Sequence, residues 1–179
     1  MADFTLNLVF GSITIRDKDI ASLKRMFDRN PIYGGPCLIL NRANGLALDA
    51  GPDSKAGAHS VLWSAHAAPW QQWRLRKTGD EVEIASASNG LSLTTMATGS
   101  KWAETWLDDK VHPDWSRRWK LSSTKDQAAF AIENASSGYA LDAGMEPDKD
   151  NKHDPHIWPT TWDPWQQWII ARLPFTSER

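Results

Sequence analysis

The chain has 179 residues, with 22 acidic and 20 basic side chains and a net charge of −2. This length allows one domain with a core of its own and leaves little room for a second, and the balanced charge excludes the basic footprint of a nucleic-acid-binding protein. The only cysteine, Cys37, excludes an intrachain disulfide and weakly favours a reducing compartment.

Residues 1–33 differ in pattern from the rest of the chain. Apolar residues nearly alternate over 4–15, which predicts a strand or a hairpin, and the apolar spacing over 20–27 predicts a short helix. A segment of this size cannot bury a core, so we expect it to pack on the main domain or on a partner. Gly34-Gly35-Pro36 marks the boundary with the main domain.

Tryptophan is the most unusual feature of the composition. All 11 tryptophans lie between Trp63 and Trp168. The sequence Pro69-Trp70-Gln71-Gln72-Trp73 occurs again, unchanged, at 164–168. A five-residue identity that contains two tryptophans predicts an internal repeat.

Three units follow from this repeat, at about 34–79, 80–126 and 127–173. Each unit opens with an apolar strand, a tight turn that contains glycine and a second strand, which together indicate a hairpin. The units close on Trp73, Trp119 and Trp168. The second strand ends in aspartate in the first and third units but in threonine in the second, at Asp49, Asp142 and Thr94.

The pattern resembles the ricin B-chain-like family, the R-type lectins, which are β-trefoils of three strand-rich repeats that end in Gln-x-Trp. The resemblance covers roughly residues 34–173 and rests on Gln71-Gln72-Trp73, on 166–168, and on Leu48-Asp49 and Leu141-Asp142. It implies an all-β, pseudo-threefold β-trefoil over 34–179, with residues 1–33 as an extension.

The repeated motif also has a physical interpretation. The three closing tryptophans are expected to share one core, because a buried indole ring removes a large apolar surface from water. The glutamine two positions before Trp73 and before Trp168 is expected on the same side of a strand, where its amide satisfies backbone groups of a turn. Gln-x-Trp is therefore predicted to be a structural element.

The resemblance implies sugar sites in two of the repeats. A carboxylate that accepts hydroxyl hydrogens, beside an aromatic ring that covers the C–H face of a sugar, makes such a site. Matching the family residue by residue places Asp49 with Trp63 in repeat 1 and Asp142 with Trp158 in repeat 3. Repeat 2 keeps an aromatic residue but lacks the aspartate, so we expect its site to be weak or silent.

Departures from the family pattern leave alternatives open. Glutamine and asparagine are frequent in the family at positions that here hold Val61, Trp70, His156 and Trp165. Either the sugar is not of the galactose type, with His66, Trp162 and His156 completing the sites, or one or both sites are inactive.

Each candidate residue also has a purely structural interpretation. The two aspartates could only stabilise turns through backbone N–H groups. Trp70 and Trp165 are expected to pack, whereas Trp102 and Trp162 lie outside the threefold set and are candidates for a binding surface.

The sequence therefore predicts a carbohydrate-binding lectin whose weak sites in repeats 1 and 3 act multivalently. The alternative is a protein-interaction trefoil such as a proteinase inhibitor. Expected partners are glycans or glycoconjugates, and a homodimer remains an alternative. No nucleophile motif or metal-ligand spacing occurs, so we expect no enzymatic activity, cofactor or metal, and 145–156 is interpreted as a solvated loop.

Localisation follows from the same features. The first residues lack the basic region of a signal peptide, and no stretch approaches the length of a membrane span. We expect a cytoplasmic or non-classically secreted protein without membrane insertion.

Overall fold

The computed structural model describes residues 4–8, 11–15, 33, 35–96, 103–109, 115–144 and 154–173. The helix predicted over 20–27, Trp102 and most of the loop 145–156 lie outside these ranges. Over the described ranges, no helix is both apolar and long enough to cross a membrane.

The first two strands form a hairpin of their own. β1 (Phe4–Leu8) and β2 (Gly11–Ile15) pair antiparallel as a two-stranded sheet, with Phe4 opposite Ile15. The structure therefore confirms the predicted hairpin, while the packing of residues 1–33 on the domain or a partner stays a prediction.

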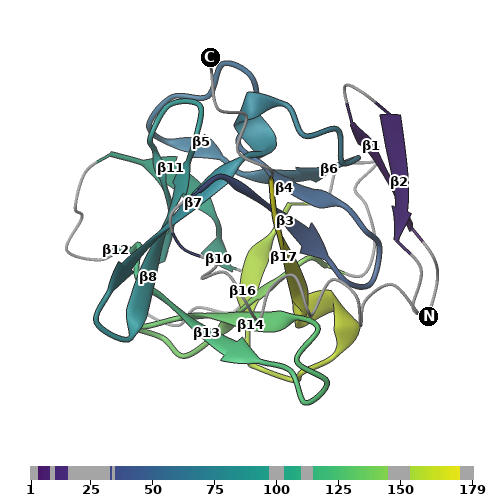
Figure 1. The fold of residues 1–179 in the computed structure, drawn as a ribbon. Helices are drawn as coiled ribbons and strands as arrows, with labels where there is room; N and C mark the ends of the chain where they lie inside the picture. The colour runs from purple at the N-terminus through teal and green to yellow at the C-terminus, as the bar shows by residue number, and fades with distance from the viewer. Residues whose placement is uncertain are drawn as a thin grey trace.

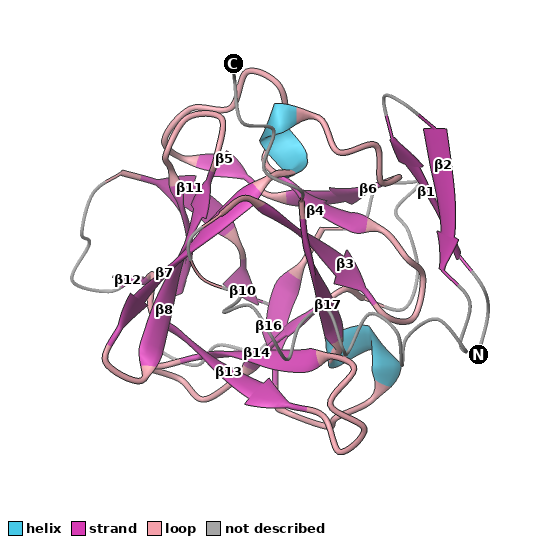
Figure 2. Ribbon diagram, viewed as in Figure 1, coloured by secondary structure: helices cyan, strands magenta, loops and turns pink. Residues whose placement is uncertain are grey.

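The remaining strands belong to one 15-stranded sheet (Figure 1; Figure 2). Repeat 1 contributes β3 (Cys37–Asn41), β4 (Ala47–Asp49), β5 (Ala58–His59), β6 (Val61–Trp63) and β7 (Trp73–Thr78). Repeat 2 contributes β8 (Glu81–Ser86), β9 (Ser92–Met96), β10 (Ala103–Glu104), β11 (Trp106–Asp108), β12 (Trp115–Ser116) and β13 (Trp119–Ser123). Repeat 3 contributes β14 (Phe130–Asn134), β15 (Ala140–Asp142), β16 (His156–Trp158) and β17 (Trp168–Arg172).

One antiparallel pairing scheme recurs in every repeat. In repeat 1, β3 pairs with β4 and β4 with β6. The equivalent pairs are β8 with β9 and β9 with β11 in repeat 2, and β14 with β15 and β15 with β16 in repeat 3. The last strand of each repeat pairs with the first strand of the next, and β17 returns to pair with β3. The ring β3-β7-β8-β13-β14-β17 is thereby closed, and closure removes the exposed strand edges of an open sheet. The architecture is that of a β-trefoil.

The three opening hairpins turn at glycines with a left-handed backbone. Gly45, Gly90 and Gly138 have φ angles of 73°, 78° and 73°. Each N–H donates to the carbonyl four residues earlier, at 2.8–2.9 Å. Glycine adopts this conformation without the steric cost that a side chain would add, which explains its place in each repeat.

The closing tryptophans form the centre of the core. Trp73, Trp119 and Trp168 are fully buried and belong to one hydrophobic cluster. Each indole Nε1 donates to a leucine carbonyl of its own repeat at 2.9 Å, so all three buried N–H groups are hydrogen-bonded. The prediction of a shared tryptophan core is confirmed.

Other predicted packing residues also lie in or against this cluster. Trp70 and Trp165 are partly buried against it, as predicted. Cys37 begins β3 and is fully buried, with its thiol donating to the Trp73 carbonyl at 3.3 Å. Burial raises the pKa of the Cys37 thiol to about 12, although the charge of Arg172 opposes this rise.

The Gln-x-Trp glutamines do not lie on strands, which corrects the prediction. Pro-Trp-Gln forms a short 3-10 helix in repeats 1 and 3, η1 (Pro69–Gln71) and η2 (Pro164–Gln166), and the following strand starts at the tryptophan. Proline fixes its φ angle and has no N–H, so it suits the first position of a helical turn better than a strand.

Candidate functional site

The glutamine of the first Gln-x-Trp motif binds the aspartate of its own repeat. Gln71 Nε2 donates to Asp49 Oδ2 at 2.9 Å and to the Ser64 carbonyl at 3.1 Å. Its Oε1 accepts from the backbone N–H groups of His66 and Ala67, at 2.9 and 3.2 Å. The prediction that this amide satisfies backbone groups of a turn is confirmed, and the aspartate is a further partner.

Repeat 3 builds the same arrangement. Gln166 Nε2 donates to Asp142 Oδ2 at 2.9 Å and to the Pro159 carbonyl at 3.0 Å. Its Oε1 accepts from the Thr161 N–H at 2.7 Å. The recurrence shows that aspartate and glutamine form one unit, although 24 residues separate them in the chain.

Both aspartates also stabilise the turn that follows them. Oδ1 accepts from the Gly51 N–H at 2.6 Å in repeat 1 and from the Gly144 N–H at 2.8 Å in repeat 3. The Asp49 side chain is buried, and burial raises the pKa of its carboxyl against the hydrogen bonds from Gly51 and Gln71 and the charge of His66. A carboxylate offers about four lone-pair positions, so these bonds leave acceptor capacity for a ligand hydroxyl.

The candidate aromatic residues lie on the strands next to these aspartates. β6 carries Trp63 alongside β4, which ends at Asp49, and β16 carries Trp158 alongside β15, which ends at Asp142. Trp63 is 43% exposed, one of the two large hydrophobic side chains most open to solvent in the described part of the chain. Trp158 is half-buried. The structure therefore brings each predicted pair onto adjacent strands, with the more open ring in repeat 1.

The two candidate histidines lie beside the aspartates of their own repeats. His66 Nδ1 accepts from the Ala68 N–H at 3.2 Å, and its ring contacts Trp70 edge-on at 5.9 Å between centroids. His156 is buried and stands opposite Asp142 in the register of β15 and β16. A β-carbon added to Gly144 would lie 3.5 Å from His156 Cε1, so this ring covers the turn after the aspartate.

Repeat 2 has lost the aspartate and the glutamine together. Thr94 occupies the aspartate position, and its hydroxyl donates to the Trp106 carbonyl at 3.4 Å. Arg117 replaces the glutamine and lies 3.8 Å from a Glu83 carboxylate oxygen. The His59 ring lies 3.7 Å from the Trp106 ring between centroids, tilted by 41°. A histidine of repeat 1 thus contacts the aromatic residue of repeat 2, and the weak or silent site of this repeat stays a prediction.

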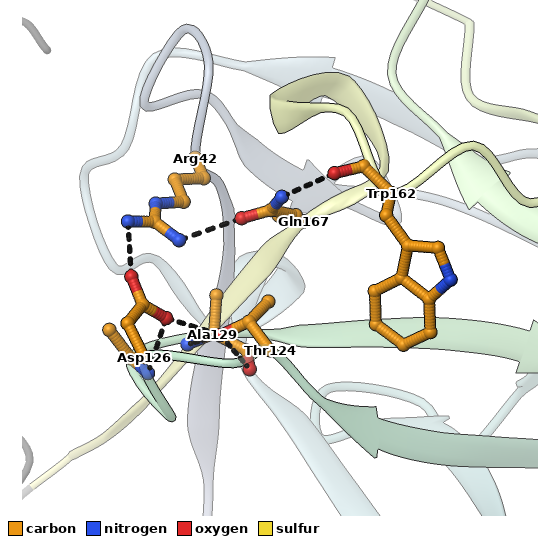
Figure 3. A network of polar contacts seen from close by, with 7 residues as sticks. Arg42, Thr124, Asp126, Ala129, Trp162 and Gln167 are labelled. Carbon is orange, nitrogen blue, oxygen red and sulfur yellow. Dashed lines mark hydrogen bonds and ion pairs between the residues drawn. The ribbon is translucent and has the colours of Figure 1, made fainter.

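Trp162 is exposed, and its part in the repeat 3 site stays a prediction. It lines a pocket of about 630 Å³ with Arg42, Gln167 and residues 123–126 at the end of repeat 2. We call it the seam pocket because Arg42 of repeat 1 and Gln167 of repeat 3 meet there. Figure 3 shows Arg42 between Asp126 and Gln167, with the indole ring of Trp162 on the other side of Gln167. Sequence reasoning missed Arg42 and Asp126, because neither belongs to a motif and their proximity arises only when the ring of strands closes.

An ion pair holds one wall of the seam pocket. Arg42 Nη2 lies 2.6 Å from Asp126 Oδ2, and the arginine side chain is only 10% exposed. Burial opposes ionisation of Asp126, but hydrogen bonds from Thr124, Arg42 and the Ala128 N–H, together with the charge of Arg42, outweigh it. They lower the pKa of this carboxyl to about 2.

This lowered pKa predicts a contribution to acid stability. The ionised Asp126 stabilises the fold above its unfolded pKa of about 3.9, and this contribution is lost as the pH falls toward 2. Asp126→Asn should therefore be less stable than the wild type at pH 6, and the difference should shrink between pH 4 and pH 2. Urea unfolding at pH 6, 4 and 2.5 measures this difference. A difference that stays constant over the three pH values would contradict the assignment.

Comparison with known proteins agrees with this geometry. Residues 29–105 match the family model described as "Ricin-type beta-trefoil lectin domain-like". No curated protein matches the chain in sequence.

Solved structures match over most of the chain. The ricin B-like lectin of Macrolepiota procera, solved with lactose, has 22% identity and a TM-score of 0.67, over 79% of this chain and 97% of that one. The designed threefold-symmetric protein ThreeFoil has 21% identity and a TM-score of 0.67, over 78% and 100%. The C-terminal half of an earthworm R-type lectin, solved with GalNAc, has 20% identity and a TM-score of 0.60, over 78% and 100%.

These findings confirm the resemblance that the repeats predicted. Residues 29–105 are similar to the ricin-type β-trefoil lectin-like domains, and the fold continues the same architecture through repeat 3 to β17.

Proposed function

We propose that the chain is a carbohydrate-binding protein without catalytic activity, and that its sites lie at Asp49 with Trp63 and at Asp142 with Trp158. The observation that carries this proposal is the exposed Trp63 ring on the strand next to a buried aspartate whose orientation is fixed by Gly51 and Gln71. The M. procera and earthworm structures, solved with lactose and with GalNAc, support the class of ligand.

The tryptophan and the aspartate of each site contact different parts of the sugar. The indole face covers the C–H side of a sugar ring and removes both surfaces from water. The aspartate oxygens accept hydrogens from ring hydroxyls, and because the carboxylate is already held in place, little side-chain entropy is lost on binding.

The two sites differ in their surroundings. In repeat 1 the position opposite Asp49 is Val61, whereas in repeat 3 the position opposite Asp142 is His156, a ring with hydrogen-bonding nitrogens. The repeat 1 site therefore relies more on stacking, and the repeat 3 site offers an additional polar group. Two weak sites of this kind would hold a multivalent glycan surface more tightly than either site holds a free sugar.

Removal of the Trp63 ring tests the repeat 1 site. Because this ring is 43% exposed, Trp63→Ala should leave the fold intact and weaken sugar binding by about tenfold, the effect of losing roughly 1.4 kcal/mol of stacking. Trp158→Ala should have the same effect in repeat 3, and the double variant should lose binding to immobilised glycans. Calorimetric titration with the best glycan ligand and retention on a glycan surface measure the two effects.

Trp106→Ala is the matched control, since this ring occupies the same position in the repeat that lacks the aspartate. It should leave sugar affinity unchanged. Asp49→Asn should also abolish binding in repeat 1, with urea unfolding as a check because Asp49 is buried. Affinity that survives Trp63→Ala, Trp158→Ala and Asp49→Asn would overturn the site assignment. Binding to a glycoprotein that free sugar does not compete would favour the protein-interaction alternative.

A further inference from the structure

The seam pocket lies at one of three related junctions between repeats. The backbone at the seams is the same: the N–H groups of Arg42, Ala87 and Ala135 donate to the carbonyls of Gln167, Gln72 and Arg118, at 2.8, 2.7 and 2.8 Å. The side chains differ, because alanine stands at two seams where the third has arginine. The closing seam between repeats 3 and 1 therefore carries a polar side chain that the other two lack.

The loop before η2 also breaks the symmetry, because a large aromatic residue stands where repeat 1 has a small one. Gln167 Nε2 donates to the Trp162 carbonyl at 2.6 Å, and Gln72 Nε2 donates to the Ala67 carbonyl at 2.9 Å, so Trp162 and Ala67 are equivalent positions. Both have a left-handed backbone, with φ angles of 64° and 57°. A bulky residue in this region is strained, and here the ring is 44% exposed rather than packed in the core. Strain kept at a surface aromatic residue is typical of a functional position.

A continuous chain of polar contacts holds the opposite wall. Asp126 Oδ1 accepts from the Thr124 hydroxyl at 2.5 Å, and Asp126 Oδ2 accepts from Arg42 at 2.6 Å. Arg42 Nη1 donates to Gln167 Oε1 at 2.7 Å, and Gln167 is bound to the Trp162 carbonyl. The charges of Arg42 and Asp126 cancel each other, and Lys125 is the other charged residue of the lining. The Asp126 side chain is 49% exposed, so its carboxylate is open to solvent.

We propose that the seam pocket is a third carbohydrate site, which takes a neutral mono- or disaccharide between the Trp162 ring and the Arg42–Asp126 pair. A volume of about 630 Å³ lies within the usual range of small-ligand sites. The planar polar groups of Arg42, Asp126 and Gln167 match the hydroxyls on one edge of a sugar, and the indole matches its C–H face. This inference rests on the carbohydrate-binding function proposed above but not on the sites at Asp49 and Asp142.

Indole signals in a two-dimensional NMR spectrum test the proposal, since each of the 11 tryptophans contributes one N–H signal. The probes are glucose, mannose, galactose, lactose and N-acetylgalactosamine, each added to the ¹⁵N-labelled full chain. The Trp162 signal, assigned with Trp162→Gly, should shift with at least one sugar. It should still shift in the Trp63→Ala/Trp158→Ala variant, with an affinity changed less than about twofold, because the sites do not share residues.

Trp162→Gly should remove sugar binding at the seam pocket without destabilising the fold. Glycine adopts the left-handed backbone freely, so the variant should be as stable as the wild type or more stable, while affinity at the seam pocket falls at least about tenfold. Ala67→Gly, which makes the same backbone change at the equivalent loop, is the control and should leave binding unchanged.

The outcomes separate the two proposals. If sugars shift the signals of Trp63 or Trp158 but not that of Trp162, the seam pocket is not a sugar site and the proposed function stands. If only Trp162 responds, the seam pocket stands and the sites at Asp49 and Asp142 fall. If no tryptophan signal responds to any of the five sugars, both proposals are overturned.

Discussion

Trp168→Ala is expected to destabilise the trefoil by about 3–5 kcal/mol, the cost of deleting a large aromatic side chain from a packed core. The ring is fully buried with Trp73 and Trp119, and its Nε1 donates to the Leu141 carbonyl at 2.9 Å. The loss is comparable to the whole stability of many domains of this size. Urea unfolding followed by far-ultraviolet circular dichroism measures it.

Trp168→Phe separates the two contributions of this residue. Phenylalanine keeps most of the apolar contact but cannot donate to the Leu141 carbonyl, and leaving a buried acceptor unpaired costs about 1–3 kcal/mol. The phenylalanine variant should therefore lie between the wild type and the alanine variant. A loss below about 1 kcal/mol for Trp168→Ala would contradict the assignment of this ring to the shared core.

Gln71→Glu is expected to destabilise the protein by about 3 kcal/mol at pH 7.5, with a deficit that shrinks on acidification. The new carboxylate would place an oxygen where Gln71 Nε2 now donates to Asp49 Oδ2 at 2.9 Å and to the Ser64 carbonyl at 3.1 Å. Two buried carboxylates at this distance cannot both ionise, so one holds a proton and its folded pKa rises well above the unfolded value of about 4. Because the folded state then binds the extra proton, the deficit grows as the pH rises through the folded pKa and shrinks as it falls toward 4.

The neighbouring glutamine supplies the control. Gln72 is half-buried, and its Nε2 donates to the Ala67 carbonyl at 2.9 Å, with no aspartate as a partner of this amide. Gln72→Glu should cost about 1 kcal/mol with little dependence on pH between 4 and 7.5. Urea unfolding of both variants at these two pH values is the measurement. An equal deficit for Gln71→Glu at both pH values would show that Asp49 is not the group that opposes the new charge.

Much of the fold was predictable because its determinants repeat in the sequence. The identical motifs at 69–73 and 164–168 set the phase of the repeats, and the turn glycines marked the hairpins. The closing tryptophans were predicted to share one core, because they hold related positions in the repeats and each buried ring removes a large apolar surface from water. The pairing of each candidate aspartate with a tryptophan came from the family resemblance, and the structure puts the two residues of each pair on adjacent strands.

The local structure of the motif was predicted less well. Gln71 was expected on a strand, since it stands two positions before Trp73 and period-two spacing is typical of strands. The proline at the start of the motif decides otherwise, because it favours the 3-10 helix η1. The partnership of this glutamine with Asp49 could not be predicted, since only the folded turn brings together two residues 22 positions apart.

Contacts between repeats were the least predictable part. Arg42 and Asp126 are separated by 84 residues and belong to no motif, yet closure of the ring places them 2.6 Å apart. His59 meets Trp106 for the same reason, across the junction of repeats 1 and 2. A repeat pattern describes each unit separately and carries no information about side chains that break the symmetry where units meet.

Binding of the full chain to an array of immobilised glycans, with and without free sugar as competitor, tests carbohydrate recognition most directly. The wild type should bind a set of glycans that share a terminal sugar, the free sugar should displace it, and a Trp63→Ala/Trp158→Ala/Trp162→Gly variant that unfolds like the wild type should not bind. A wild-type chain that binds none of the glycans, or a triple variant that binds them as well as the wild type does, would contradict this account.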